Sequence, residues 1–410
     1  MIGRSRTVLV LLASFVMQFF IAILTYGAGF IHLSLLEVFK ESDATTSIVG
    51  SLFINLMSAT GPVASYLVNR WGCRLTAVAG GMLLVAGLIG SYFSRSLRVL
   101  IATNGIISGL GIGLALLPCI VSVGFVFPKH NGIAMGITTS GVGMGMLASG
   151  PITQYLLDTY GLRGTFLLSA AIASHIIPCG MLLITPYNKN QKKEKTNERF
   201  AFLQTYLTLL KTPALMCVLI GAVLWNIAYA VIMIQLPNYV VLSGSSKKEA
   251  SFLFTVIGIG TILSRITIGL AISPNGLDPL LLNFGLTACV GALIVTFPFF
   301  VKFSSGPMVF ASLYGIYSGG LLVFTVPLCL EFAGVQRLSS AVGLWFFLLG
   351  MGSFAGPPLA GLVFDVTGSH DLSYILLGFC VLVAAVCSLA ATFWRKPKTE
   401  NMTEEVVQNA

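Results

Sequence analysis

The chain has 410 residues, of which 56% are hydrophobic and only 9% charged, whereas soluble domains carry about 25% charged residues. This composition excludes a water-soluble globular protein. The formal net charge of +9 would suit a nucleic-acid partner, but the apolar composition leaves no room for a soluble nucleic-acid-binding domain.

Apolar stretches recur along nearly the whole chain. A helix needs about 20 consecutive apolar residues to cross roughly 30 Å of hydrocarbon. The sequence predicts twelve such spans, at residues 7–31, 46–67, 75–94, 98–123, 131–157, 164–186, 213–241, 249–272, 279–301, 307–332, 340–366 and 372–394. The predicted fold class is therefore all-α integral membrane, with twelve transmembrane helices.

The first span follows a short basic start with Arg4 and Arg6, which is also typical of a signal peptide. Residues 7–31 are longer than the apolar region of a signal peptide, which has about 7–15 residues, and they lack a clear small-x-small cleavage site. We therefore expect this segment to be the first membrane helix.

Lys and Arg are distributed unevenly between the two sides of the predicted membrane. If both termini are cytoplasmic, fifteen of the 23 Lys and Arg residues lie in inside segments, seven lie outside, and Arg265 lies within a span. This bias follows the positive-inside rule. It predicts cytoplasmic termini, which require an even number of spans, and it explains the net charge without a nucleic-acid partner.

A polar, charged stretch at 188–199 separates the sixth and seventh spans. It divides the chain into an N-terminal six-helix bundle at 1–187, a cytoplasmic linker at 188–212, a C-terminal six-helix bundle at 213–394 and a cytoplasmic tail at 395–410. Such a charge run is typical of a solvated linker, and a regulatory or lipid-binding role is the alternative.

A short pattern closes the second, fifth and eleventh spans: Pro, six residues, Asn or Asp, two residues and Gly. It begins at Pro62, Pro151 and Pro358 and includes Asp158 and Asp365. These spans are equivalent if each bundle is built from inverted three-helix repeats, as in the major facilitator fold. The alternative is that the pattern is only a good helix-ending turn.

No cofactor, metal or catalytic centre is predicted. The eight cysteines form no CxxC pair and are typical of apolar packing residues. Glycine strings at 109–113 and 141–145 lie inside apolar spans without a Lys-Ser/Thr partner, which favours close helix packing over phosphate binding. No His, Asp or Glu cluster has catalytic spacing, so we do not expect an enzyme.

Arg265 is the one charged residue that the predicted spans place away from a helix end. A guanidinium is always charged and fits a carboxylate with two parallel hydrogen bonds, and such a residue in a membrane usually faces a cavity or a partner. We expect it to bind an organic anion. The alternative is a fixed ion pair with Glu331, near the end of the tenth span.

Helical spacing gives further candidates for the cavity wall. Asn226, Tyr229 and Met233 share one face of the seventh span, and Tyr314 and Tyr317 share one face of the tenth. Each could equally form a hydrogen bond between helices. Together they would give a mostly apolar site with a few polar points, which suits a small molecule.

The loop after the fourth span reads Phe127-Pro-Lys129-His-Asn-Gly-Ile-Ala134-Met-Gly136 and continues to Gly141 and Gly145. It resembles the signature of the monocarboxylate transporter family, although His130 and Asn131 replace its arginine pair. Two other segments are similar to motifs of that family, Tyr160-Gly-Leu-Arg163-Gly-Thr-Phe and Gly334-Val-Gln-Arg337-Leu-Ser-Ser-Ala-Val-Gly343. The resemblance covers both halves of the chain.

This resemblance implies a major facilitator carrier for short carboxylates or related organic solutes, at the plasma membrane. Proton-coupled members have an Asp where this chain has Thr261 and a Lys where it has Phe30, so we expect a divergent carrier without proton coupling. Some relatives are accompanied by a single-span ancillary glycoprotein, which the sequence leaves open. A sensor or scaffold that transports nothing is the alternative function.

The predicted substrate-binding residues are Arg265, Thr261, Tyr26, Phe30, Asn226, Tyr229 and Tyr317. Residues of the family motifs and of helix ends are expected to have gating or structural roles: Lys129, Gly136, Arg163, Asp158, Asp365, Arg70, Glu331 and Arg337.

Overall fold

The structure of the protein is a computed structural model that describes residues 4–41, 43–185, 198–272, 276–368 and 370–395. Every regular element within these ranges is helical, which confirms the all-α fold class. The α-helices are α1 Arg4–Phe39, α2 Asp43–Ala59, α3 Gly61–Phe93, α4 Leu97–Leu100, α5 Gly109–Val126, α6 Asn131–Ser174, α7 Ile176–Leu182, α8 Glu198–Leu210, α9 Pro213–Leu242, α10 Lys247–Ala271, α11 Pro279–Phe300, α12 Gly306–Ser318, α13 Thr325–Ala333, α14 Leu338–Thr367 and α15 His370–Ala390. A π-helix at Ile101–Ser108 joins α4 to α5, and short 3₁₀ turns lie at Leu321–Phe324, Val335–Arg337 and Ala391–Trp394.

The sequence sets several helix starts by capping. Ser246 begins α10 with a capping box, in which its hydroxyl accepts from the backbone N–H of Glu249 at 3.2 Å and the Glu249 carboxylate accepts from the Ser246 N–H at 2.8 Å. Asp278 caps α11 with its carboxylate, which accepts from the backbone N–H of Leu280 at 2.9 Å and from that of Leu281 at 3.4 Å. Both caps satisfy backbone groups that would otherwise lack partners at the membrane surface.

The twelve predicted spans lie on the helices of the described residues, and the turns at Gly72 and Gly161 fall between predicted spans. The described residues contain ten apolar helical stretches long enough to cross a membrane. One of them, at 131–182, holds both the fifth and the sixth span. The second span is divided between α2 and the start of α3, because Pro62 has no N–H for the helix ladder.

The glycine of the repeated pattern is the residue that makes each turn. Gly72, Gly161 and Gly368 have φ of 86°, 64° and 66°, a region in which residues with a Cβ are strained. At Gly72 and Gly161 this one residue leaves the helical conformation, so the ranges given for α3 and α6 each contain one helix before the turn and another after it. The helix-ending turn proposed as the alternative is therefore present at all three positions, whether or not the spans are repeats.

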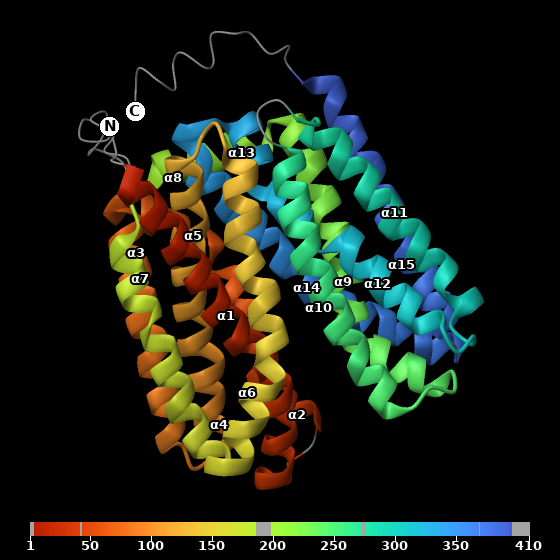
Figure 1. The fold of residues 1–410 in the computed structure, drawn as a ribbon. Helices are drawn as coiled ribbons and strands as arrows, with labels where there is room; N and C mark the ends of the chain where they lie inside the picture. The colour runs from red at the N-terminus through yellow and green to blue at the C-terminus, as the bar shows by residue number, and fades with distance from the viewer. Residues whose placement is uncertain (1–3, 42, 186–197, 273–275, 369, 396–410) are drawn as a thin grey trace.

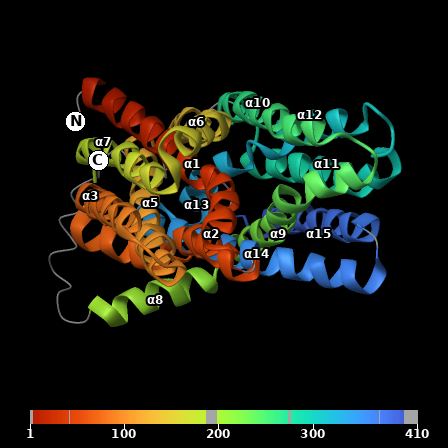
Figure 2. The same cartoon turned by 90° about the horizontal axis from the view of Figure 1, so that it is seen from below.

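The molecule has two side-by-side groups of helices, α1–α7 and α9–α15, referred to below as the first and second halves (Figure 1). Figure 2, seen from below, shows the same separation, with α8 beside the first half. The precise limits expected for the two bundles, linker and tail stay a prediction, since residues 186–197 and 396–410 lie outside the described ranges.

The halves touch where α6 packs on α10 and where α14 packs on α2 and α3; we call these two contacts the seam. Glycines bring the backbones together there. A Cβ on Gly61 would lie 2.2 Å from the carbonyl oxygen of Gly343, and a Cβ on Gly136 would lie 2.5 Å from that of Arg265. The seam thus depends on small residues, as the glycine-rich spans predicted.

Candidate functional site

Arg265 lies in the middle of the molecule, on α10, with only 4% of its surface exposed. Its Nε donates to the carbonyl oxygen of Gly319, next to α12, at 2.9 Å, and its Nη1 donates to the carbonyl oxygen of Thr139 on α6. The close contact of Gly136 with the Arg265 backbone holds this stretch of α10 against α6. The guanidinium is therefore positioned by backbone groups from both halves.

No carboxylate within the described ranges forms an ion pair with Arg265. Glu331, the partner considered from the sequence, instead forms an ion pair with Arg395 at 2.5 Å, and Arg395 also pairs with Asp278. Carbonyl dipoles compensate a buried cation only in part. The Arg265 guanidinium is thus a buried positive charge without a matching negative charge from the described part of the protein.

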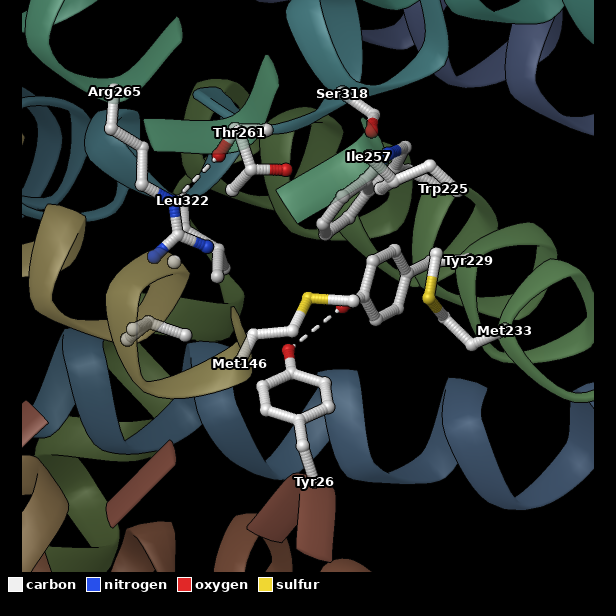
Figure 3. Close-up of a pocket in the computed structure, with 13 residues that line it drawn as sticks. Tyr26, Met146, Trp225, Tyr229, Met233, Ile257, Thr261, Arg265, Ser318 and Leu322 are labelled. Atoms are coloured by element: carbon white, nitrogen blue, oxygen red, sulfur yellow. Dashed lines mark hydrogen bonds between the residues drawn. The ribbon is translucent and has the colours of Figure 1, made fainter. Parts of the chain in front are cut away.

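A small cavity lies beside this guanidinium (Figure 3). Its volume is about 20 Å³, close to what a single water molecule needs. The lining residues come from α1, α6, α9, α10 and the end of α12 with the turn that follows: Tyr26, Val142, Gly143, Met146, Trp225, Tyr229, Met233, Ile257, Thr261, Arg265, Ser318, Gly319 and Leu322. Both halves therefore contribute to its wall.

Two tyrosines meet across the cavity. The hydroxyl of Tyr26 on α1 lies 3.0 Å from that of Tyr229 on α9, within hydrogen-bond distance (Figure 3). The Tyr229 ring also packs against Trp225, with ring centroids 5.3 Å apart. This pair connects the halves beside the site, and it helps to keep the cavity as small as it is.

Four of the predicted substrate-binding residues line the cavity, namely Tyr26, Tyr229, Thr261 and Arg265. The other three predicted residues, Phe30, Asn226 and Tyr317, are not part of the lining. The Asn226 amide donates to the carbonyl oxygen of Leu349 and to the Ser353 hydroxyl, both at 2.5 Å. It joins α9 to α14, which is the alternative role that the sequence left open.

The lining residues missed from the sequence follow a regular spacing. Trp225 lies one turn before Tyr229 and two turns before Met233 on α9. Ile257 lies one turn before Thr261 and two turns before Arg265 on α10. Residues four apart lie on the same helix face. Extending each predicted face by one turn would have found Trp225 and Ile257, whereas nothing in the sequence singles out Met146 or Leu322.

The residues expected to gate or support the site lie mostly near the surface. Lys129, Arg163 and Arg337 are exposed. Asp158 accepts from the Gln154 amide at 2.8 Å, and Arg70 donates to the Tyr66 hydroxyl at 3.0 Å. Gly136 lies in the seam, as described above, and the side chain of Asp365 lies outside the described residues.

A polar contact across the seam was not predicted. Asn69, the Asn of the first repeated pattern, donates to the Ser340 hydroxyl at 3.3 Å and accepts from the Ser339 hydroxyl. Asn69 lies on α3 and the two serines begin α14. These hydrogen bonds close the seam beyond Gly61 and Gly343, at the end of the molecule that also carries α8.

A profile of the Major Facilitator Superfamily matches residues 10–333. Curated relatives include monocarboxylate transporter 2 of Meriones unguiculatus, 28% identical with 85% of this chain and 76% of the relative covered, and monocarboxylate transporter 11 of Mus musculus, 29% identical with 85% and 79% covered.

The fold is similar to that of solved structures. The crystal structure of the E. coli fucose:proton symporter matches with a TM-score of 0.74 over 94% of this chain and 98% of the symporter, at 14% identity. A proton:xylose symporter bound to a bromo-deoxy-glucose matches with a TM-score of 0.68 at 18% identity. At these identities the likeness shows the fold alone.

Proposed function

Since this chain belongs to the major facilitator superfamily and is a multi-pass secondary transporter of a small organic solute, we propose that the solute carries a carboxylate and binds at Arg265. The relatives named as monocarboxylate transporters support this choice of solute class. The superfamily match and the seam between two helix groups support transport by alternating access, in which the halves open on one side at a time.

The observation that carries the proposal is the unmatched charge of Arg265. Its guanidinium is almost fully buried, faces the cavity and donates to two carbonyls without an ion pair among the described residues. A guanidinium presents five N–H donors, and the two observed hydrogen bonds leave some of them for a ligand. A carboxylate would supply both the missing charge and a matching pair of acceptors.

The rest of the wall suits a small apolar body. Trp225, Tyr229, Met146 and Leu322 give it aromatic and flexible apolar surface, which is usual for small-molecule sites. The cavity of about 20 Å³ is smaller than any organic acid. We infer that the structure represents a closed arrangement, and that the solute enters only when the halves move apart.

We propose facilitated transport without proton coupling. The described residues that line the cavity include no His, Asp or Glu, and Thr261 is a neutral side chain beside Arg265. A proton carrier at the site would need a group that changes charge between about pH 5 and 8. We also propose that both termini are cytoplasmic, for which the distribution of Lys and Arg is the support, and that the protein lies in the plasma membrane, as the family resemblance implies.

The test is uptake of a panel of labelled carboxylates into proteoliposomes that contain the purified protein. Charge-assisted hydrogen bonds contribute about 1.5–3 kcal/mol, so we expect Arg265→Gln to lower uptake by about 10- to 100-fold. Arg265→Lys should recover part of it, because an ammonium keeps the charge but lacks the fork. Arg98→Gln, at an exposed arginine outside the site, is the matched control.

Unchanged uptake in Arg265→Gln would remove this residue from the solute site. The same vesicles address coupling. For a solute that stays ionised, we expect uptake to be unaffected by an imposed pH gradient, whereas strong stimulation by an inward proton gradient would contradict facilitated transport.

A further inference from the structure

Helix α8 lies across one end of the molecule and does not span it. Figure 2 shows it crosswise at the rim beside the first half, and its end leads directly into α9. Tyr206 makes a hydrogen bond of 2.7 Å with Ser65 on α3, and Phe202 packs its ring on those of Tyr66 and Tyr206 at 5.3 and 4.7 Å. One face of α8 is therefore firmly attached to α3.

A second face of α8 is apolar but uncovered. Leu203, Leu207 and Leu210 are 56%, 48% and 43% exposed, while Leu209 on the attached face is only 1% exposed. Positions i, i+4 and i+7 form one stripe along a helix. A stripe of three exposed leucines is unusual for a water-exposed surface when the helix already packs another face against the protein.

The third face of α8 is polar and carries Gln204, Thr205 and Thr208. At 3.6 residues per turn, the attached, apolar and polar faces are separated by roughly a third of a turn each. A helix at the rim with this arrangement can rest on the protein, dip its leucines into the bilayer and keep its polar face in water. This is the pattern of a helix that lies in the membrane interface.

The charge around α8 indicates which lipids would be in contact. Lys211 follows the helix and is exposed, and Arg70 and Arg74 are exposed on the neighbouring stretch of α3. Trp71, between them, is 51% exposed, as is typical of a residue at the headgroup level. Basic residues beside an interfacial helix attract anionic headgroups.

We propose that α8 is an interfacial helix whose Leu203, Leu207 and Leu210 insert into the bilayer, and that anionic phospholipid headgroups hold it there. Because α8 contacts both α3 and α14, lipid contact would also hold it on the closed end of the seam. The inference concerns a surface away from the solute site and does not depend on which solute is carried.

The test places a solvatochromic thiol dye on the full-length protein at Leu207→Cys or, as the matched control on the polar face, at Gln204→Cys. Wild-type protein treated with the dye gives the background from the native cysteines. Each variant is reconstituted into vesicles of phosphatidylcholine alone or with about one quarter phosphatidylserine. Emission is then measured with a nitroxide quencher attached to the lipid headgroup and with iodide in the water.

We expect the dye at 207 to emit at shorter wavelength than the dye at 204 and to be quenched by the lipid nitroxide, more strongly when phosphatidylserine is present. The dye at 204 should be quenched by iodide. Equal quenching of both positions by iodide would place the leucines in water and overturn the proposal. Protection of position 207 from both quenchers would mean that protein covers it, which also overturns the proposal. Nitroxide quenching at 207 that is equal with and without phosphatidylserine would overturn the role of anionic lipid.

Discussion

The hydroxyls of Tyr26 and Tyr229 form a direct hydrogen bond between the two halves beside the solute site. A solute that enters between them has to separate this pair. A neutral hydrogen bond contributes about 0.5–1.5 kcal/mol, so its loss on opening opposes binding by a measurable amount without preventing it.

We therefore expect Tyr26→Phe and Tyr229→Phe each to tighten the binding of a transported carboxylate by about two- to tenfold. The double variant should bind no more tightly than either single variant, since all three lack the same hydrogen bond. Equilibrium binding to purified protein measures this. Tyr317→Phe, outside the cavity lining, is the control, and additive effects of the two substitutions would contradict a shared bond.

At this scale the sequence could identify the charged residue but not all of its neighbours. Arg265 was identifiable because a cation inside an apolar span is exceptional. The sequence could not decide the role of Asn226, because an amide in a membrane helix can face either a cavity or another helix. In the structure its amide donates hydrogen bonds to Leu349 and Ser353 on α14. Trp225 has no such polar signal, although it is one turn from Tyr229.

Among the elements, α3 and α14 make the closest backbone contact of the seam that we describe, at Gly61 and Gly343. The obstacle that a new Cβ would meet there is a backbone carbonyl, which cannot rotate away as a side chain could. The closed arrangement thus depends on the absence of one methyl group.

Gly61→Ala should keep the protein folded but prevent the seam from closing, because the added Cβ would lie 2.2 Å from the Gly343 oxygen. We expect uptake to fall by about tenfold or more, which corresponds to at least 1.4 kcal/mol. A cysteine pair at Asn69 and Ser340, whose side chains are 3.3 Å apart, should cross-link less in this variant. Gly50→Ala, where a Cβ meets nothing within 4 Å, should behave as wild type.

The helices also show where reading a sequence for spans reaches its limit. Composition was enough to locate twelve apolar segments, because each has to match the thickness of a bilayer. The breaks predicted between the second and third spans and between the fifth and sixth spans coincide with Gly72 and Gly161, where the chain leaves the helical conformation. Composition could not show that one residue at positive φ is enough to make each of these turns.

For the molecule as a whole, an ion-pair network holds three helix ends of the second half together. Arg395, after α15, bonds to Asp278 at the start of α11 and to Glu331 at the end of α13. Burial raises the pKa of Asp278, but the hydrogen bonds from Arg395 and from the Leu280 N–H outweigh it and hold the pKa below its ordinary value.

A carboxyl whose pKa is lower in the folded than in the unfolded protein stabilises the fold above its ordinary pKa, which is about 3.9. This contribution is lost as the pH falls through the lower, folded value. We expect Asp278→Asn to melt at a lower temperature than wild type near neutral pH. The difference should shrink as the pH falls below about 4 and vanish below the folded pKa. Thermal unfolding of both proteins across this pH range checks the prediction, and a difference that stays constant would contradict it.

How the halves meet was beyond the sequence. Residues of α6 and α10 that are more than 100 positions apart come together at Thr139 and Arg265, and no local pattern encodes that pairing. The cavity exists only as a result of this placement, so its size and its complete lining had to come from the structure.

The bond from Arg265 to the Thr139 carbonyl ties α10 to α6, and it has to break whenever the halves rotate apart. An empty carrier would then leave donors of a buried cation unmatched, whereas a loaded one would cover them with the cargo's own oxygens. Reorientation of the empty carrier should therefore be the slow step of the transport cycle. Vesicles preloaded with labelled solute should release it faster when the same unlabelled compound is supplied outside, because exchange of solutes should be faster than net efflux. Equal efflux with and without solute outside would show that Arg265 does not slow the reorientation of the empty carrier.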